Sequence, residues 1–202
     1  MNGPRVVCFL SDYGYEDDFA GTCRGVIASL APDIRVIDIT HGLARHDVLG
    51  AAFVLRNSMR YMPDGAVHLA VVDPGVGGPR RAVALRSGGD RLFVGPDNGL
   101  LSFAVAAAGG ATRAVSLTNR ALWRDDMPAT FHGRDLFMPV AGHLVAGTPL
   151  DEAGEVVAVS SLVTLPVPQW RLAGTGLAGT GWPSRCPAAT PPGNSVCTPA
   201  SR

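Results

Sequence analysis

The sequence predicts an α/β fold in which helices flank a largely parallel sheet. Short apolar runs of strand length alternate with amphipathic runs of helix length along the first 165 residues. The connections between these runs are short, as in repeated β-α-β units. One run, residues 67–72 ("VHLAVV"), is apolar without alternation, which is typical of a strand that is buried on both faces of a parallel sheet.

The first part of the chain alternates strands with helices. The first helix is closed by Pro32, because proline cannot continue a helix. The second begins at Asp47, a residue suited to a helix start, and is ended by Pro63 and Gly65. The expected elements are strands over residues 5–10, 34–39 and 67–72 and helices over 17–30 and 47–62.

The next part continues this pattern after a glycine-rich turn. A "PDNG" turn precedes one expected helix, and Pro139 interrupts another. The expected elements are strands over residues 82–85, 91–95 and 112–117 and helices over 100–108 and 133–147.

The composition changes near residue 165. Residues 1–165 are predicted to form one α/β catalytic domain, and 166–202 a linker followed by a Pro-rich disordered tail. The final 22 residues contain five Pro and no Ile, Leu, Phe, Tyr or acidic residue. Such a segment cannot bury enough apolar surface to offset the entropy lost on ordering.

Charge and cysteine content narrow the class of protein. The 17 basic and 17 acidic residues cancel, so the sequence indicates no binding of nucleic acid or of an anionic membrane. No apolar stretch predicts a membrane span or a signal peptide. The four cysteines form no C-x-x-C pair, and Cys8 lies in an expected buried strand as a reduced thiol. A cytoplasmic protein is therefore expected.

Polar residues follow three expected strands, at the point where each strand ends. They are Asp12, Asp73 and the pair Asp97 and Asn98. Asp and Asn side chains bond their own backbone in turns, and this explanation suits the "PDNG" turn best. Asp12 and Asp73 are instead expected to project from adjacent carboxyl ends of one sheet, where open α/β sheets bind ligands.

Histidines lie near the ends of other expected elements. His41 follows a strand, His46 begins a helix and His132 precedes one, so each is open to a structural or a ligand-binding role. No motif such as H-E-x-x-H supports a metal site, and none is predicted. Dinucleotide binding by "GVGGPR" is excluded, because a strand follows where the phosphate-binding helix would have to begin.

Five motifs together resemble one known family. "FLSDYG", "VIDITHGLARHDV", "VVDPGVGGPRR", "GPDNGLL" and "TFHGRDLF" are similar to the S-adenosyl-L-methionine (SAM) hydroxide adenosyltransferases, relatives of the fluorinases and chlorinases. The resemblance runs from about residue 6 to about residue 172. It implies cleavage of SAM by a water-derived nucleophile that attacks the ribose C5′ and releases adenosine and L-methionine. SAM is then the substrate, and no cofactor is implied.

The resemblance also assigns site residues. It places a catalytic triad on Asp73, Arg80 and His132, in which the glycine-rich turn brings the guanidinium back to the carboxylate. Asp12 matches the residue that binds the ribose diol, a task that suits the two oxygens of a carboxylate. The substrate-binding positions that it implies are Asp12, Asn98, His46, Phe131 and Gly133.

The chain departs from the family in two respects. Gly133 stands where the halogenases place a halide-binding serine, which favours a hydrolase over a halogenase. The β-rich second domain, which in full-length members completes the pocket across a homotrimer interface, is expected to be missing and replaced by the Pro-rich tail, as a frameshift would produce. A slower enzyme is expected, and the alternative is an inactive fragment that binds adenosine or only self-associates.

Overall fold

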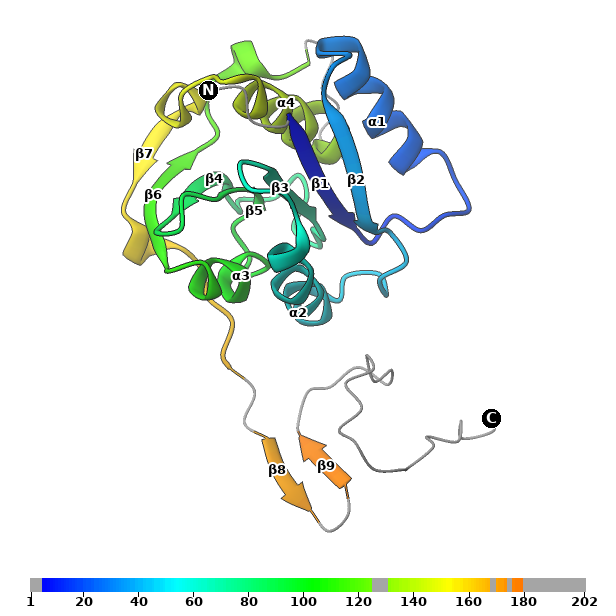
Figure 1. The fold of residues 1–202 in the computed structure, drawn as a ribbon, viewed down its shortest axis with the longest axis vertical. Helices are drawn as coiled ribbons and strands as arrows, with labels where there is room; N and C mark the ends of the chain where they lie inside the picture. The colour runs from blue at the N-terminus through cyan, green and yellow to red at the C-terminus, as the bar shows by residue number, and fades with distance from the viewer. Residues whose placement is uncertain (1–4, 125–130, 168–169, 174–175, 180–202) are drawn as a thin grey trace. The chain divides into compact units, whose positions relative to one another are not determined.

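The computed structural model describes residues 5–124, 131–167, 170–173 and 176–179 (Figure 1). The chain divides into two units, residues 1–166 and 167–202. In the second unit, the described strands β8 (Trp170–Ala173) and β9 (Gly176–Gly179) form an antiparallel pair. This pairing is absent from the sequence prediction, which has an extended linker there. The predicted disorder of residues 181–202 lies outside the described residues.

A seven-stranded sheet forms the centre of the first unit, in the order β2-β1-β3-β5-β4-β6-β7. The first four strands in this order pair in parallel, and the remaining pairings are antiparallel. The predicted α/β fold is confirmed, with a mixed sheet. The strands are β1 (Val6–Ser11), β2 (Arg35–Thr40), β3 (Val67–Val71), β4 (Ala82–Ser87), β5 (Leu92–Pro96), β6 (Ala111–Ser116) and β7 (Glu155–Val157).

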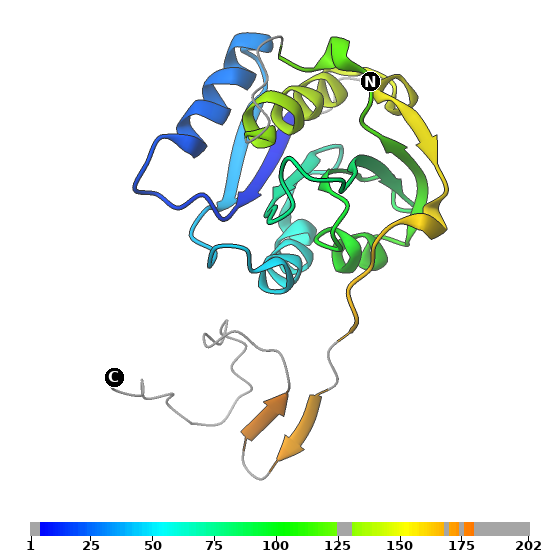
Figure 2. The same ribbon diagram turned by 180° about the vertical axis from the view of Figure 1, so that it is seen from behind.

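Helices cover both faces of the sheet, as the two opposite views show (Figures 1 and 2). They are α1 (Phe19–Leu30), α2 (Val48–Ser58), α3 (Ser102–Ala107) and α4 (Met138–Ala146). Side chains of α1 and α4, such as Ile27 and Leu144, pack on one face against Phe9 and Leu69. Leu55 of α2 and residues of α3 pack on the other face. None of the helices among the described residues is both long and apolar enough to cross a membrane.

Helix boundaries differ from the sequence prediction where polar side chains or proline intervene. α1 begins at Phe19, two residues late, because the Asp17 side chain accepts the N–H of Phe19 in a preceding bend. The helix expected over residues 133–147 is a five-residue π-helix, Gly133–Phe137, followed by α4. Pro139 lies in the first turn of α4, where a helix tolerates proline best. Shorter 3₁₀ segments are Met59–Tyr61, Arg120–Leu122, Leu150–Ala153 and Val159–Ser161.

The order of the strands places a crevice between β1 and β3. From β1 the chain passes through α1 to β2 on one side, and from β2 it returns through α2, over the opposite face, to β3 on the other side. Ligands bind in open α/β sheets at such reversals, beyond the carboxyl ends of the strands. Asp12 directly follows β1, and Asp73 lies two residues beyond the end of β3.

Candidate active site

A cavity of about 360 Å³ lies beyond the carboxyl ends of β1 and β3. Three segments supply most of its lining: the loop after β1, the loop after β3 and the turn that opens the π-helix. The sequence-predicted residues that line it are Asp12, His46, Asp73, Phe131, His132 and Gly133. Positions separated by up to 121 residues in the chain are thus gathered at one place.

Arg80 does not itself line the cavity, but it joins two residues that do, Asp73 and His132. Its Nε atom donates to both carboxylate oxygens of Asp73 at 2.9 Å, and its Nη2 atom also donates to Oδ2. The same Nη2 atom lies 2.7 Å from Nδ1 of His132. The Asp73 side chain is only 6% exposed and that of Arg80 only 12%, so water screens this ion pair poorly.

The contact with Arg80 fixes the protonation of the His132 ring. A guanidinium has donors only, so Nδ1 of His132 must accept, and the neutral ring carries its proton on Nε2. Burial, and next the positive charge of Arg80, lower the pKa of His132, while Asp73 and Asp135 act in the opposite direction. At neutral pH the imidazole is therefore uncharged, with its Nε2–H as a donor.

The turn after β3 explains how the sequence brings Arg80 back to Asp73. Its backbone reverses through bonds from Val76 N–H to the Asp73 carbonyl and from Gly78 N–H to the Gly75 carbonyl. A Cβ atom at Gly75 would lie 3.1 Å from Cγ of Arg80, so glycine lets the arginine stem pass close to the turn.

The Asp12 side chain holds the loop between β2 and α2. Its Oδ2 atom accepts the backbone N–H of His46 at 2.7 Å. His46 has a φ of +65°, a left-handed conformation that costs free energy for any residue except glycine. Asp47 then caps α2 by accepting the N–H of Gly50 at 2.8 Å. Asp12 thus contributes to the backbone geometry that brings His46 to the cavity.

Aromatic rings form one wall of the cavity. The Tyr13 ring makes edge contacts with Phe19 and Phe131 at centroid distances of 5.9 and 5.7 Å. Burial raises the pKa of Tyr13 well above its ordinary value, assisted by Cys23, Asp12 and Asp73, so its phenol stays protonated. A Cβ atom at Gly133 would lie 1.7 Å from the Tyr13 hydroxyl oxygen, so a side chain at this position would require the Tyr13 ring to move.

We expect Gly133→Ala to move the Tyr13 ring and to destabilise the fold by about 1–3 kcal/mol, because an added methyl group overpacks this contact. Chemical denaturation measures the change. Gly25→Ala in α1 is the control, since no atom lies within 4 Å of its Cβ position and alanine favours a helix. Equal stability of the two variants would contradict the packing argument.

Asn98 does not line this cavity. Its Nδ2 atom donates to the carbonyl of Val72 at 2.9 Å, and its Oδ1 atom accepts the N–H of Leu100 at 3.1 Å. Asp97 pairs with Arg81 and accepts the N–H of Val163. Both side chains therefore stabilise the turn after β5, and Asn98 also bonds the backbone of Val72, immediately before Asp73.

Sequence reasoning did not single out six other residues that line the cavity, namely Tyr13, Asp17, Phe19, Arg45, Val71 and Val76. Tyr13 and Arg45 directly adjoin Asp12 and His46, so their place beside two expected site residues was the available signal. Asp17 and Phe19 lie where the first helix was expected to begin, and the pattern of a helix start does not show which way they point.

Comparisons with known proteins agree with this geometry. Residues 7–154 match the family model described as the SAM hydroxide adenosyltransferase N-terminal domain. An (R)-S-adenosyl-L-methionine hydrolase of Salinispora tropica is 56% identical over 162 residues, which are 80% of this chain and 61% of that protein. A fluorinase of an Actinoplanes species is 28% identical over 190 residues, covering 83% of this chain and 63% of the fluorinase.

A crystal structure of an uncharacterized conserved protein from Thermotoga maritima has a similar fold. It superposes with a TM-score of 0.77 and 36% sequence identity, over 82% of this chain and 64% of that one. The chain spans about three fifths of the length of the curated relatives that it matches. Because the family model covers most of residues 1–166 and includes every residue of the cavity, the chain belongs to the SAM hydroxide adenosyltransferase family.

Proposed function

We propose that this chain hydrolyses SAM to adenosine and L-methionine, without a cofactor. The observation that carries the proposal is the contact of Arg80 with both Asp73 and His132, two residues that line one cavity. The name of the Salinispora tropica relative supports SAM as the substrate. The zero net charge of the chain gives no electrostatic attraction to a polyanion, so we propose no binding to nucleic acid or membranes.

The proposed reaction is a displacement at the ribose C5′. The water oxygen forms a bond to C5′ as the C5′–S bond breaks, and the electron pair of that bond passes to sulfur. The positively charged sulfonium becomes the neutral thioether of methionine, and one proton leaves the water. A sulfonium is a good leaving group, so the site has mainly to position and activate the water.

The hydrogen bonds divide these tasks among the three residues. Nδ1 of His132 accepts from Arg80, so its Nε2–H is the group that can orient the water by donating to its oxygen. Oδ2 of Asp73 accepts two bonds from Arg80, whereas Oδ1 accepts one and keeps a further lone pair, so Oδ1 of Asp73 is the proposed proton acceptor. Arg80 holds both in place with a permanent charge.

A halogenase is the less favoured alternative. Gly133 has no side chain that could hold a halide, and the Tyr13 hydroxyl occupies the space beside it. Cys8 and Cys23 are buried free thiols, which supports a reducing, cytoplasmic location for the protein.

Incubation of the purified chain with SAM in ¹⁸O-labelled water tests the proposal. Adenosine that carries ¹⁸O at its 5′-hydroxyl is the expected product, detected by mass spectrometry. A 5′-halogenated product in the presence of chloride or fluoride would favour the halogenase. Adenosine binding without any product would favour a fragment that binds but does not turn over.

Asp12 is the proposed ligand of the ribose diol. Asp12→Asn keeps an oxygen that can accept from His46 N–H but loses the charge and one acceptor. We expect adenosine to bind about 10- to 100-fold more weakly, because a diol hydroxyl loses its partner at about 1–3 kcal/mol. Calorimetry with adenosine measures the change. Unchanged affinity would exclude Asp12 from diol binding.

A further inference from the structure

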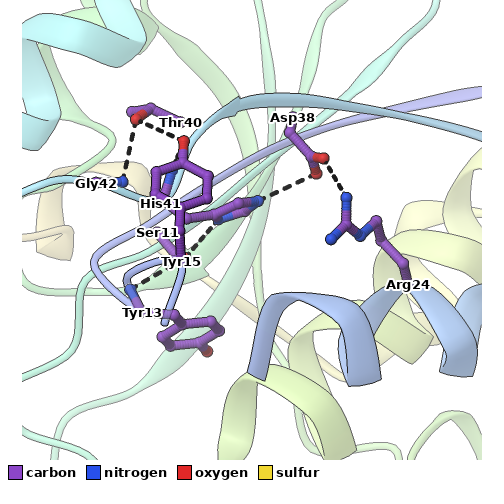
Figure 3. Close-up of polar contacts among 8 residues, drawn as sticks. All are labelled: Ser11, Tyr13, Tyr15, Arg24, Asp38, Thr40, His41 and Gly42. Atoms are coloured by element: carbon purple, nitrogen blue, oxygen red, sulfur yellow. Dashed lines mark hydrogen bonds and ion pairs between the residues drawn. The ribbon is translucent and has the colours of Figure 1, made fainter. Parts of the chain in front are cut away.

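A second polar network surrounds the buried side chain of His41 (Figure 3). His41 is 1% exposed. Its Nδ1 atom lies 2.7 Å from the hydroxyl of Ser11, and its Nε2 atom lies 3.1 Å from Oδ1 of Asp38. Asp38 in turn accepts from Arg24 at 2.6 Å. The network runs from an ion pair near the surface to a hydroxyl in the interior.

The hydrogen-bond donors and acceptors of this network can be assigned one after another, from Asp38 through His41 to Ser11. The Asp38 carboxylate only accepts, so Nε2 of His41 carries the proton. In the neutral ring Nδ1 then accepts the Ser11 O–H, which leaves the Ser11 oxygen to accept the N–H of Tyr13 at 3.4 Å. Every polar atom of the buried part is satisfied, which stabilises one arrangement of these side chains.

Ser11, His41 and Asp38 are connected in the order of a Ser-His-Asp catalytic triad, but they cannot act as one. The Ser11 residue is 0% exposed, so no substrate reaches its hydroxyl. A nucleophile must lie within reach of the reacting carbon. The role of this network is therefore to hold backbone and not to attack a substrate.

The backbone of His41 holds the same loop as its side chain. The carbonyl of His41 accepts the N–H of Gly14 at 2.8 Å, and its N–H donates to the Tyr15 hydroxyl at 2.9 Å. With the Ser11 contact, His41 fixes both ends of residues 11–15. Asp12 and Tyr13 lie inside this loop, and both line the cavity.

We propose that His41 is a positioning residue that sets the Asp12 carboxylate, through Ser11, for the ribose diol of the substrate. The inference rests on the proposed function. The buried imidazole ties the carboxyl end of β1 to the end of β2, so the position of Asp12 depends on two neighbouring strands. Loss of the imidazole leaves Asp12 present but free to shift.

Binding of adenosine and of 2′,3′-dideoxyadenosine, which lacks the diol, tests this role. His41→Phe keeps an aromatic ring beside Phe9 and removes both ring nitrogens. We expect it to weaken adenosine binding roughly tenfold, as for one or two lost hydrogen bonds, and to leave dideoxyadenosine binding unchanged. His41→Asn, which restores an acceptor near Nδ1, should recover part of the preference. Ser11→Ala, which removes only a hydroxyl, should act in the same direction as His41→Phe.

His68→Phe is the matched control, because His68 is a buried histidine of β3 outside the cavity. It should keep the full preference for adenosine. His41→Phe combined with Asp12→Asn should lose little more than Asp12→Asn alone, since both act on the same contact.

The proposal is overturned if the unsubstituted chain prefers adenosine over dideoxyadenosine and both Ser11→Ala and His41→Phe keep that preference. It is also overturned if these substitutions weaken the binding of adenosine and of dideoxyadenosine equally. The proposed function fails separately, if the unsubstituted chain forms no adenosine from SAM.

Discussion

Asp73→Asn is expected to lower the turnover of SAM by at least about a thousandfold while the fold remains intact. The amide keeps the size of the side chain but has no charge to pair with Arg80 and no basic oxygen to take a proton from water. One of its ends is also a donor, which faces the donors of Arg80. Single-turnover assays of adenosine formation measure the loss.

Asp97→Asn provides the matched control for this variant. Asp97 also follows a strand, has a side chain only 5% exposed and pairs with an arginine, but it lies outside the active-site cavity. We expect it to lose stability and keep its turnover number. If Asp73→Asn unfolds at the temperature of the assay, or if the two variants lose turnover equally, the catalytic role of Asp73 is contradicted.

A second large effect is expected on stability at acidic pH. His68 is fully buried in β3, stacks on Phe93 and has no hydrogen-bond partner for either ring nitrogen among the described residues. Burial, with a smaller contribution from Arg91, lowers the pKa of His68 from 6.5 to about 4. The unfolded chain therefore binds a proton that the folded chain refuses between about pH 6.5 and 4.

Stability is thus complete above pH 6.5 and falls as the pH is lowered through this window, by about 3 kcal/mol in total from this one residue. His68→Phe should remove this part of the pH dependence and pack on Phe93. Urea denaturation of both proteins at pH 7 and pH 4 measures the difference. His143→Gln in α4 controls for the loss of a histidine as such and should keep the dependence on His68. If the free energy of unfolding falls by the same amount between pH 7 and pH 4 in His68→Phe and in the unsubstituted chain, this explanation is ruled out.

The sequence pattern predicted most of the fold because apolar periodicity follows burial directly. The expectation of a largely parallel sheet did not include the antiparallel pairing of β4 with β5 and β6. The turn of four residues between Ser87 and Leu92 was the available signal for β4 and β5, because so short a connection joins only antiparallel strands. The sequence prediction also missed β7, a three-residue edge strand with two exposed positions, because such a strand has no core-facing pattern. The π-helix before α4 has no pattern of its own in the sequence.

The site was predictable in part. The position of Asp12 and Asp73 at strand ends followed from physical reasoning, and the structure brings both to one cavity. Arg80 and His132 were assigned only through the family resemblance. The contact of Tyr13 with Gly133 joins residues 120 positions apart, and no local pattern of either one indicates the other.

The division of the sheet into parallel and antiparallel halves has a consequence for the order of folding. β4 and β5 form a hairpin that closes a short loop, whereas β1 must find β3 across more than fifty intervening residues. Closing the longer loop costs more chain entropy, so we expect the hairpin to gain protection first in pulsed hydrogen exchange. Asp12 and Asp73 can meet only after the slower pairing, so a kinetic intermediate that holds the hairpin would be unable to bind adenosine.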